Sequence, residues 1–162
     1  MRQLMLLRHA KSGWDDGQTD HARTITEHGR HSAALVGAHL KTSGLIPQLV
    51  LCSSAIRARS TLDLAMEAGG WSTAVTETDA LYNTHVSGAM AVIAEAPDVD
   101  TLLVVGHEPT WSSMIHALTG NEVVMRTATL VVLELDRESW ADIEPDSSRI
   151  ISVTHAHQLA AG

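Results

Sequence analysis

The sequence predicts an α/β fold, a three-layer sandwich with a mainly parallel central sheet flanked by helices. Three short apolar runs carry this prediction, at residues 4–7, 49–52 and 101–105. Continuous apolar runs of this length are typical of strands that are buried on both faces. Segments with helical spacing of apolar residues lie between them, and strands that alternate with helices favour a parallel sheet.

Each predicted element has its own signal. The helical segments place apolar residues on one face, begin at capping residues such as Thr26, and end at glycine or proline. Residues 73–78 alternate and are rich in threonine, which favours a strand. In chain order, we predict strands at 4–7, 49–52, 73–78, 101–105, 129–135 and 150–154, and helices from Thr26 to Gly44, over 55–68, from Ser87 to Ala96, and from Glu108 to Leu118.

Two polar segments are predicted to lack regular structure. Residues 10–25 contain two glycines and several aspartates, which indicates a loop. Residues 136–149 hold five acidic groups and a proline, and we interpret them as a surface connection. No internal repeat or low-complexity linker interrupts the chain, so we expect a single domain over residues 1–162.

The composition excludes several classes of protein. Of 162 residues, 44% are hydrophobic and 19% charged, as in globular proteins. The formal net charge of −8 disfavours nucleic acid and anionic membranes as partners. The apolar stretch before Arg8 is too short for a secretion signal, and no run is long enough to span a bilayer, so a cytoplasmic location is expected. The only cysteine, Cys52, cannot form an intramolecular disulfide, and its apolar neighbours predict a buried thiol.

Polar residues follow three of the predicted strands where each strand ends. In parallel sheets, ligands bind beyond the carboxyl ends of the strands. We therefore expect these side chains to converge on one pocket, with the two serines also as helix caps. They are Arg8 and His9 after the first strand, Ser53, Ser54 and Arg57 after the second, and His107 and Glu108 after the third.

This set of side chains suits phosphoryl transfer. A neutral imidazole such as that of His9 can attack phosphorus, while fixed cations hold the three equatorial oxygens. Arg8 and Arg57 offer planar forks of donors that match phosphate, and His107 adds another donor. Arg57 also lies near a predicted helix N-terminus, which attracts anions.

Three sequence blocks resemble the signatures of the histidine phosphatase superfamily. Residues 7–12 (Leu-Arg-His-Ala-Lys-Ser) resemble its Leu-Arg-His-Gly/Ala signature, and residues 53–61 resemble its Ser-x-x-x-Arg-Ala-x-x-Thr block. Residues 105–109 (Val-Gly-His-Glu-Pro) resemble its third block. The blocks occur in the family's order and span residues 4–118. The short chain looks most like the SixA-type phosphohistidine phosphatases, rather than the larger phosphoglycerate mutases.

The resemblance implies a role for each matching position. His9 would be the nucleophile that carries the phosphoryl group, Arg8 and Arg57 would bind its oxygens, and His107 would donate a hydrogen bond to the same group. The resemblance implies no metal and no organic cofactor. Further candidates for substrate binding are Lys11, Ser12, Trp14 and Ser54, with Arg23 and Arg126 as candidates for the pocket rim.

A departure from the family bears on the substrate. Mutase-like members often carry a catalytic Glu after the strand that matches residues 73–78, but residues 79–84 contain none. An alkoxide leaving group benefits from a positioned acid, whereas imidazole leaves more readily from phosphohistidine. We therefore hypothesise a phosphoramidate substrate. The remaining candidate acids are Asp15, Asp16, Glu77 and Glu108.

Loop length gives a second indication of the substrate. Only about ten residues separate the strand ending near residue 78 from the next helix, which leaves little chain for a lid. We expect an open pocket, which would admit a phosphorylated side chain of another protein.

Other functions stay open at this point. They are a phosphatase or mutase of small phosphorylated molecules, and a binding module for phosphorylated ligands without turnover. A histidine-based metal site is least favoured, because His28, His31 and His39 lack cysteine or clustered carboxylate partners. His155 and His157 are predicted to share one exposed face of the last strand.

Overall fold

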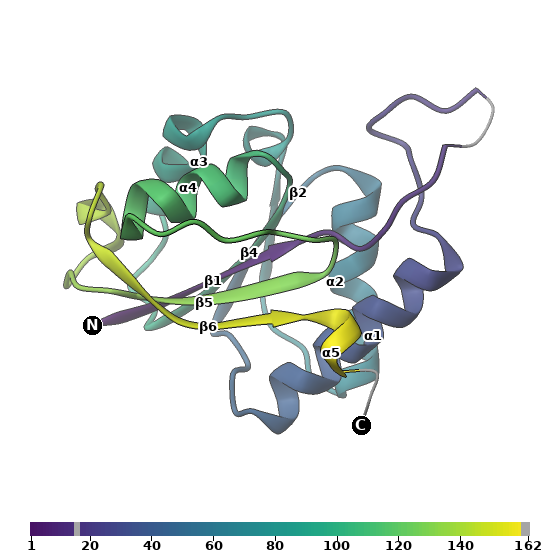
Figure 1. Cartoon of the computed structure of the whole chain (residues 1–162), viewed down its shortest axis with the longest axis horizontal. Coiled ribbons are helices and arrows are strands. Elements are labelled where there is room, and N and C mark those ends of the chain that lie inside the picture. Colours follow the sequence, from purple (N-terminus) through teal and green to yellow (C-terminus); the bar gives the residue numbers. More distant parts are fainter. Residues whose placement is uncertain (15–16, 160–162) are drawn as a thin grey trace.

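A six-stranded sheet lies at the centre of the computed structural model, which describes residues 1–14 and 17–159 (Figure 1). The strands are β1 (Arg2–Arg8), β2 (Leu49–Ser53), β3 (Val75–Thr78), β4 (Thr101–Gly106), β5 (Thr129–Leu135) and β6 (Ser148–His155). Their order is β3-β2-β4-β1-β5-β6. The first four are parallel to one another, while β5 and β6 add an antiparallel edge.

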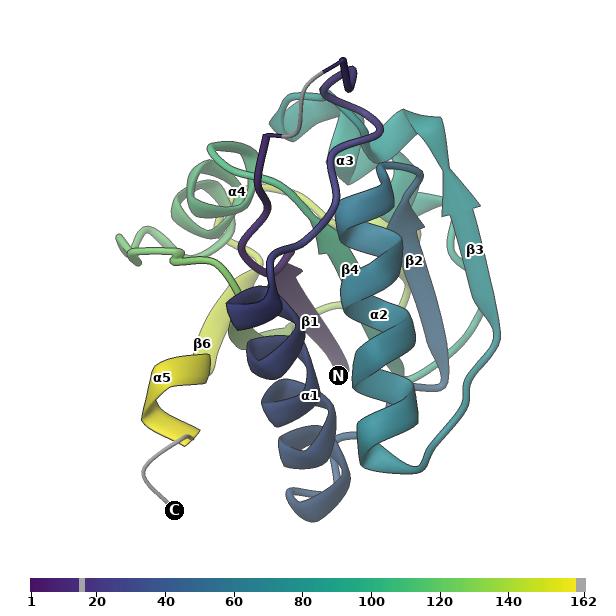
Figure 2. The ribbon, with the colours of Figure 1, turned by 90° about the vertical axis from the view of Figure 1, so that its right-hand side faces the viewer.

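Helices cover both faces of this sheet, which confirms the predicted three-layer α/β sandwich with a mainly parallel sheet. The helices are α1 (Glu27–Thr42), α2 (Ile56–Gly69), α3 (Val86–Ala94), α4 (Thr110–Thr119) and α5 (Ala156–Leu159), with 3₁₀ turns η1 (Asp79–Leu81) and η2 (Trp140–Asp142). Figure 2 shows α1 and α2 side by side on one face, with α3 and α4 on the other.

The apolar run in β1 serves both layers. Leu4 and Leu6 pack in the cluster that contains α3 and α4, whereas Met5 and Leu7 pack in the cluster that contains α1 and α2. Successive side chains in a strand point to opposite faces, so a central strand with two covered faces must be apolar at every position. This is why the run is continuous and does not alternate with polar residues.

Helices α1 and α2 approach closely at Gly37. A Cβ atom at this position would lie 1.9 Å from the carbonyl oxygen of Ala65. The indole N–H of Trp71 donates to the carbonyl oxygen of Gly37 at 3.1 Å and closes the contact from the side. Only glycine fits here, and this contact fixes how far α2 stands from its neighbour.

Helix starts differ from the predictions in three places. Ala55, not Ser53 or Ser54, is the N-cap of α2, and it makes no side-chain capping bond. The N-cap of α3 is His85, two residues before the predicted cap Ser87, so the helix begins at Val86. Helix α4 begins at Thr110 and not at Glu108, whose carboxylate accepts a hydrogen bond from the N–H of Ser112 in the first turn. The predicted cap Thr26 of α1 is confirmed, as its hydroxyl accepts from the N–H of Gly29 at 3.0 Å.

The interpretation of residues 136–149 as a surface connection is wrong in part. The segment contains η2, whose Trp140 is almost fully buried and packs in the core against α3. Its indole N–H donates to the carbonyl oxygen of Val99 at 2.8 Å. The acidic residues around Trp140 are mostly exposed. The polar composition of the segment therefore predicted a surface position although one of its side chains is part of the core.

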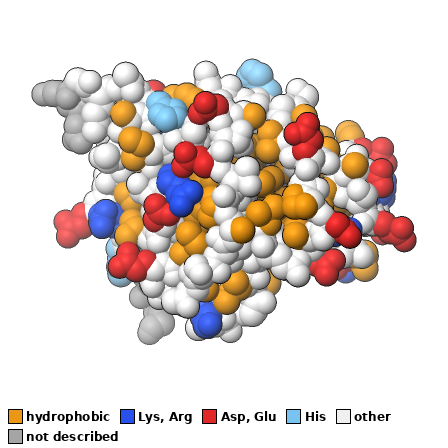
Figure 3. Space-filling model, turned by 180° about the vertical axis from the view of Figure 1, so that it is seen from behind, with side chains coloured by type: hydrophobic (Ala, Val, Ile, Leu, Met, Phe, Trp, Pro, Cys, Tyr) orange, Lys and Arg blue, Asp and Glu red, His pale blue; other side chains and the backbone are white. Residues whose placement is uncertain are grey.

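The C-terminal histidines also differ from expectation. His157 lies in α5 rather than on the last strand, and its ring stacks on that of His155 at 5.6 Å. The exposed position predicted for His157 is correct. No helix in residues 1–14 and 17–159 combines the length and apolar character that a bilayer span requires. Acidic side chains are spread widely over the face seen in Figure 3.

Candidate active site

His9 is the first residue after β1, and only 7% of its surface is exposed. Its backbone N–H donates to the carbonyl oxygen of Gly106 on β4 at 3.1 Å, so the neighbouring strand fixes its position. Its ring Nδ1 lies 2.7 Å from the carbonyl oxygen of Ala10. Since a carbonyl only accepts, Nδ1 carries the proton. The neutral ring therefore has its lone pair on Nε2, where a nucleophile needs it.

Burial keeps this imidazole neutral. Loss of contact with water on burial, reinforced by His107, Arg57 and Arg8, lowers the pKa of His9 to about 3, and the bond to Ala10 opposes this only in part. At neutral pH the ring is therefore unprotonated and available for attack on phosphorus.

Arg57 lies in the first turn of α2, and Asp20 holds it in place. Its Nη1 donates to the backbone oxygen of Asp20 at 2.7 Å, and its Nη2 donates to Asp20 Oδ2 at 3.2 Å. The hydroxyl of Tyr82 donates to the same oxygen at 2.6 Å. The hydrogen bond from Tyr82, followed by those from Arg23 and Arg57, lowers the pKa of Asp20 to about 2. The carboxylate stays charged and orients the guanidinium.

Arg8 is the last residue of β1 and is anchored from another direction. Its Nη1 donates to the carbonyl oxygen of Met125 at 2.9 Å, in the segment before β5. Burial lowers the pKa of Arg8, and Glu108 opposes this. An arginine remains charged at neutral pH even so. Two guanidinium groups from two elements thus line one pocket.

His107 follows β4 and lies beside His9. The ring centroids of His9 and His107 are 5.2 Å apart, and the Tyr82 ring lies edge-on to His107 at 5.8 Å. The Nε2 atom of His107 is 2.7 Å from the hydroxyl of buried Ser53. Burial, followed by the charge of Arg57, lowers the pKa of His107 to about 4, so this ring is also neutral at pH 7.

Three buried nitrogens of the site lack hydrogen-bond partners among the described residues: Arg8 Nε, Arg57 Nε and His107 Nδ1. A buried donor without an acceptor is destabilising by about 1–3 kcal/mol. All three residues line one pocket of about 280 Å³. A bound oxyanion would offer such donors their acceptors, which is the behaviour of a preformed anion site.

A second pocket of about 170 Å³ adjoins the first and shares Arg57, His107 and Glu108 with it. Its other walls come from Asp20, Tyr82 and the start of α4. The first pocket therefore concentrates positive charge, whereas the second adds a phenol and a carboxylate. This division suits a phosphoryl group in the first pocket and the rest of a substrate in the second.

The comparisons with known proteins agree with this geometry. Residues 4–90, more than half of the chain, match the model of the histidine phosphatase superfamily, branch 1. This chain belongs to the histidine phosphatase superfamily. An uncharacterised protein of Mycobacterium leprae is 34% identical over 161 residues, which cover 90% of this chain and 97% of that protein.

Solved structures place the phosphatase in the SixA type, as predicted. The structure of the proposed phosphohistidine phosphatase SixA from Nakamurella multipartitia matches with a TM-score of 0.79 and 32% identity, over 95% of each chain. A mycobacterial glucosyl-3-phosphoglycerate phosphatase shares the fold, with a TM-score of 0.70 and 16% identity over 93% of this chain and 97% of that one. The protein is thus a phosphatase that works through a phosphohistidine intermediate.

The phosphatase gathers most of its predicted site residues in one place. The pocket of about 280 Å³ is lined by Arg8, His9, Lys11, Ser12, Arg23, Arg57, His107, Glu108 and Thr127. Lys11 is exposed at its rim, and Ser12 accepts a hydrogen bond from Arg23 at 2.8 Å. The four expected catalytic residues and the rim candidate Arg23 are thus brought together.

Other predicted residues of the phosphatase lie outside this lining. Ser54 is paired with His21, whose Nε2 is 3.0 Å from its hydroxyl. Trp14 is 66% exposed, with the Arg23 guanidinium 4.0 Å from its ring. Exposed Arg126 also lies outside the pocket lining.

Of the candidate acids, Glu108 alone among the described residues lines the phosphoryl pocket. Glu77 lies on β3, with its carboxylate 3.9 Å from Arg59. Asp15 and Asp16 fall outside the described residues. Both carboxylate oxygens of Glu108 accept hydrogen bonds from Ser112 at 2.7 Å, one from its N–H and one from its hydroxyl.

Sequence reasoning missed Asp20, His21 and Tyr82. Asp20 lies in a loop that its composition assigned to solvent, and its importance follows from Arg57, 37 residues later. The ring of His21 packs edge-on against Tyr82 at 4.8 Å. Tyr82 did carry a signal, because it is the only tyrosine in a chain with 3% aromatic residues.

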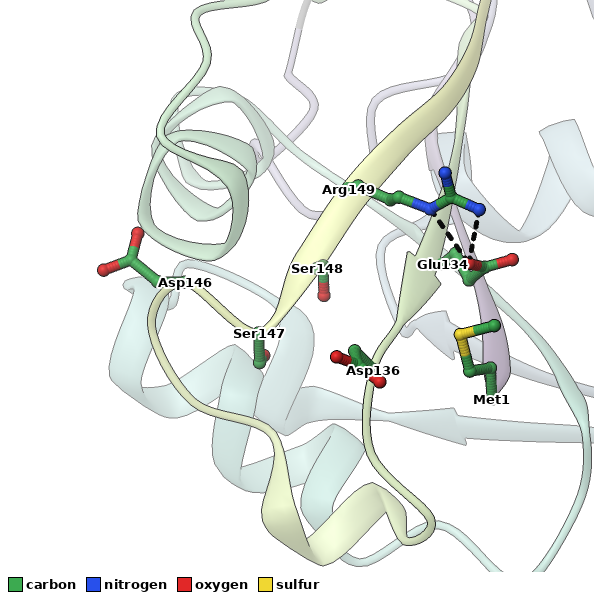
Figure 4. A pocket seen from close by; sticks show the side chains of 7 residues that line it. All are labelled: Met1, Glu134, Asp136, Asp146, Ser147, Ser148 and Arg149. Carbon is green, nitrogen blue, oxygen red and sulfur yellow. Dashed lines mark hydrogen bonds and ion pairs between the residues drawn. The ribbon is translucent and has the colours of Figure 1, made fainter.

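The phosphatase has another pocket at the opposite end of the sheet (Figure 4). Glu134 and Arg149 form an ion pair at 2.7 Å on its wall, and none of the predicted site residues lines it.

Among the residues that the structure describes, no group of three or more histidine, cysteine or acidic side chains is arranged to hold a metal. Cys52 is buried, as expected, and its pKa is raised to about 12 by burial.

Proposed function

We propose that this phosphatase removes the phosphoryl group from phosphohistidine on a protein, with His9 as its nucleophile. The observation that carries the proposal is a pair of adjoining pockets that share Arg57, His107 and Glu108. Arg8 and Arg23 line only the first pocket, and Asp20 and Tyr82 line only the second. The first step attaches the phosphoryl group to His9, and the second step releases it to water.

In the first step, His9 Nε2 attacks phosphorus while the bond from phosphorus to the substrate nitrogen breaks. Arg8 and Arg57 hold the oxygens of the transferring group, and a donor nitrogen of His107 adds a further hydrogen bond. The Nδ1–H of His9 stays on the carbonyl oxygen of Ala10, which stabilises the positive ring that forms. In the second step, water attacks phosphorus and His9 leaves as neutral imidazole.

The second pocket favours an imidazole leaving group. The imidazole of phosphohistidine leaves phosphorus most readily when its other ring nitrogen is protonated, and a carboxylate near that nitrogen stabilises the protonated form. Asp20 and Glu108 both line the second pocket, and the Tyr82 ring offers an edge for contact with another ring. A leaving group that itself carries a carboxylate, as in a phosphoglycerate, would lie near two carboxylates there, with Arg57 as the single arginine among the lining residues.

The test is a paired turnover assay with a phosphohistidine-bearing protein and an aryl phosphate monoester. We expect phosphohistidine to turn over with the higher kcat/KM, and His9→Ala to abolish both activities. A short incubation should also yield a phosphoryl-enzyme that is labile in acid and stable in base, as expected for phosphohistidine. Ester turnover at the higher kcat/KM would contradict the proposal.

A second candidate is a phosphatase of small phosphate monoesters. The observation that favours it is Glu108, a carboxylate that lines both pockets and would protonate an alkoxide leaving group. Comparison of Glu108→Gln with Glu77→Gln separates the two functions. Loss confined to substrates with poor leaving groups supports this second function, and Glu77→Gln serves as the control because Glu77 lies outside both pockets.

A further inference from the structure

The hydroxyl of Ser53 is a hidden part of the site. Ser53 is the last residue of β2, is fully buried, and lies 54 residues before His107 in the chain. Its Oγ atom lies 2.7 Å from His107 Nε2 and accepts a hydrogen bond from the backbone N–H of Ala55 at 3.2 Å. Its two partners lie at the ends of elements of the site: His107 follows β4, and Ala55 directly precedes α2, the helix that carries Arg57.

Counting protons decides the direction of the bond between Ser53 and His107. A hydroxyl has one hydrogen to donate and two lone pairs that accept. The N–H of Ala55 only donates, so it uses a lone pair. Among the described residues, His107 Nε2 is then the acceptor available to the hydroxyl hydrogen. If Nε2 carried a proton instead, that hydroxyl hydrogen would be buried without an acceptor, which is destabilising.

We propose that Ser53 is a positioning residue that fixes His107 in the Nδ1–H tautomer, so that its free N–H is held ready for a phosphoryl oxygen. Nδ1 is the ring nitrogen without a partner among the described residues, on a ring 5.2 Å from that of His9. The opposite tautomer would present a lone pair to an anion and repel it. The low pKa of His107 supports the assignment, because only a neutral ring has a tautomer to choose.

This inference deepens the proposed function and rests on His107 as a phosphoryl-binding group, but its first test needs no substrate. Nitrogen-15 NMR of the imidazoles distinguishes a protonated ring nitrogen from one with a lone pair. In the wild-type protein at pH 7, we expect His107 to carry its proton on Nδ1. A proton on Nε2 would overturn the inference, whatever the substrate proves to be.

The second test is Ser53→Ala. Without the hydroxyl, we expect His107 to move toward the Nε2–H tautomer, kcat/KM to fall about 10- to 100-fold, and the Kd for inorganic phosphate to rise by a similar factor. An unchanged tautomer with unchanged phosphate affinity in a folded variant would overturn the inference. If the variant does not fold, the wild-type spectrum alone decides.

Ser147→Ala is the matched control. Ser147 is also buried, and its hydroxyl also makes two hydrogen bonds, both with the backbone of Glu144. It lines the pocket at the opposite end of the sheet (Figure 4). We expect this variant to lose stability while the His107 spectrum and the phosphate affinity stay unchanged.

The proposed function and the tautomer assignment can fail separately. If the wild-type protein carries its proton on Nδ1 of His107 but does not turn over phosphohistidine, the proposed function is contradicted and the tautomer assignment stands.

Discussion

The hydroxyl of Thr61 accepts a hydrogen bond from the backbone N–H of Ala10 at 2.9 Å. This bond joins helix α2 to the segment after β1 that carries His9. The same hydroxyl donates to the carbonyl oxygen of Arg57 at 2.7 Å. One fully buried side chain thus spans the two segments that carry His9 and Arg57. The spacing of His9 and Arg57 therefore depends on a hydroxyl that bonds to the backbone of both segments and to neither of these two side chains.

Replacement of Thr61 by valine tests this link. The N–H of Ala10 would be buried without an acceptor, so the free energy of unfolding should fall by about 1–3 kcal/mol. We also expect kcat to fall about 10-fold or more, because small misplacements of reacting groups slow catalysis strongly. Urea denaturation and initial rates measure the two effects.

Two further variants control for the loss of the hydroxyl. Thr61→Ser keeps both hydrogen bonds and should retain kcat. Thr119→Val removes an equivalent bond to the carbonyl oxygen of Ile115 at the far end of α4, so it should lower stability alone. If Thr61→Val retained wild-type kcat, the link would be structural only.

Arg57 and Arg59 are two arginines of α2, and replacing each in turn tests the phosphoryl-binding role proposed for Arg57. Arg57 points to Asp20 in the site, whereas Arg59 donates to Asp63 at 3.0 Å on the outer face of α2. A lysine at position 57 has no planar fork and cannot hold Asp20 and a phosphoryl group together. We expect Arg57→Lys to lower kcat/KM about 100-fold and Arg59→Lys to leave it unchanged. An unchanged kcat/KM for Arg57→Lys would contradict the prediction, because it would show that a positive charge suffices without the planar geometry.

The buried neutral ring of His9 should make stability depend on pH. Its pKa is lowered to about 3 in the folded protein, whereas in the unfolded chain it lies near the ordinary value of 6.5. As the pH falls below 6.5, the unfolded state therefore binds the proton first, and stability decreases until the pH approaches 3. For His9 this amounts to about 1.5 kcal/mol between pH 6.5 and pH 5.

The measurement compares urea denaturation of the wild type and His9→Gln at pH 7.5, 6.5, 5.5 and 5, roughly the range where a free imidazole titrates. Glutamine does not titrate, so the variant should lose less stability on acidification than the wild type. Parallel pH profiles for the two proteins would contradict the burial argument.

Gly37→Ala tests the close approach of α1 and α2. Alanine in place of glycine favours a helix by about 1 kcal/mol, but the new methyl would meet the backbone of Ala65 at 1.9 Å. Overpacking against backbone should outweigh the propensity gain, with a net destabilisation of about 1–3 kcal/mol. Chemical denaturation measures it, and a more stable variant would mean that the helices separate easily.

Local sequence patterns predicted those parts of the fold that depend on local chemistry. The buried runs of β1, β2, β4 and β5 are continuous because both faces are covered, and such runs are visible in any sequence. Trp140 escaped prediction because its burial depends on the α3 layer, which lies distant in the chain. The polar residues around it gave the opposite indication.

The site divides in the same way. His9, Arg57 and His107 were identified by motif blocks that resemble a known family, and the structure brings them together. Asp20 and Tyr82 are 62 residues apart and gain their importance from one hydrogen bond between them. No local pattern encodes a contact of that kind, so it emerges only when loop, helix and strand are packed.

The position of β1 in the sheet has a consequence for biosynthesis. Residues 2–8 are translated before β4 and β5, the strands with which they pair, which begin at residues 101 and 129. During translation, β1 and the adjoining His9 therefore remain without both neighbouring strands until residues 129–135 have left the ribosome. Phosphatase activity in a nascent or truncated chain would thus indicate that β1 has paired with both β4 and β5.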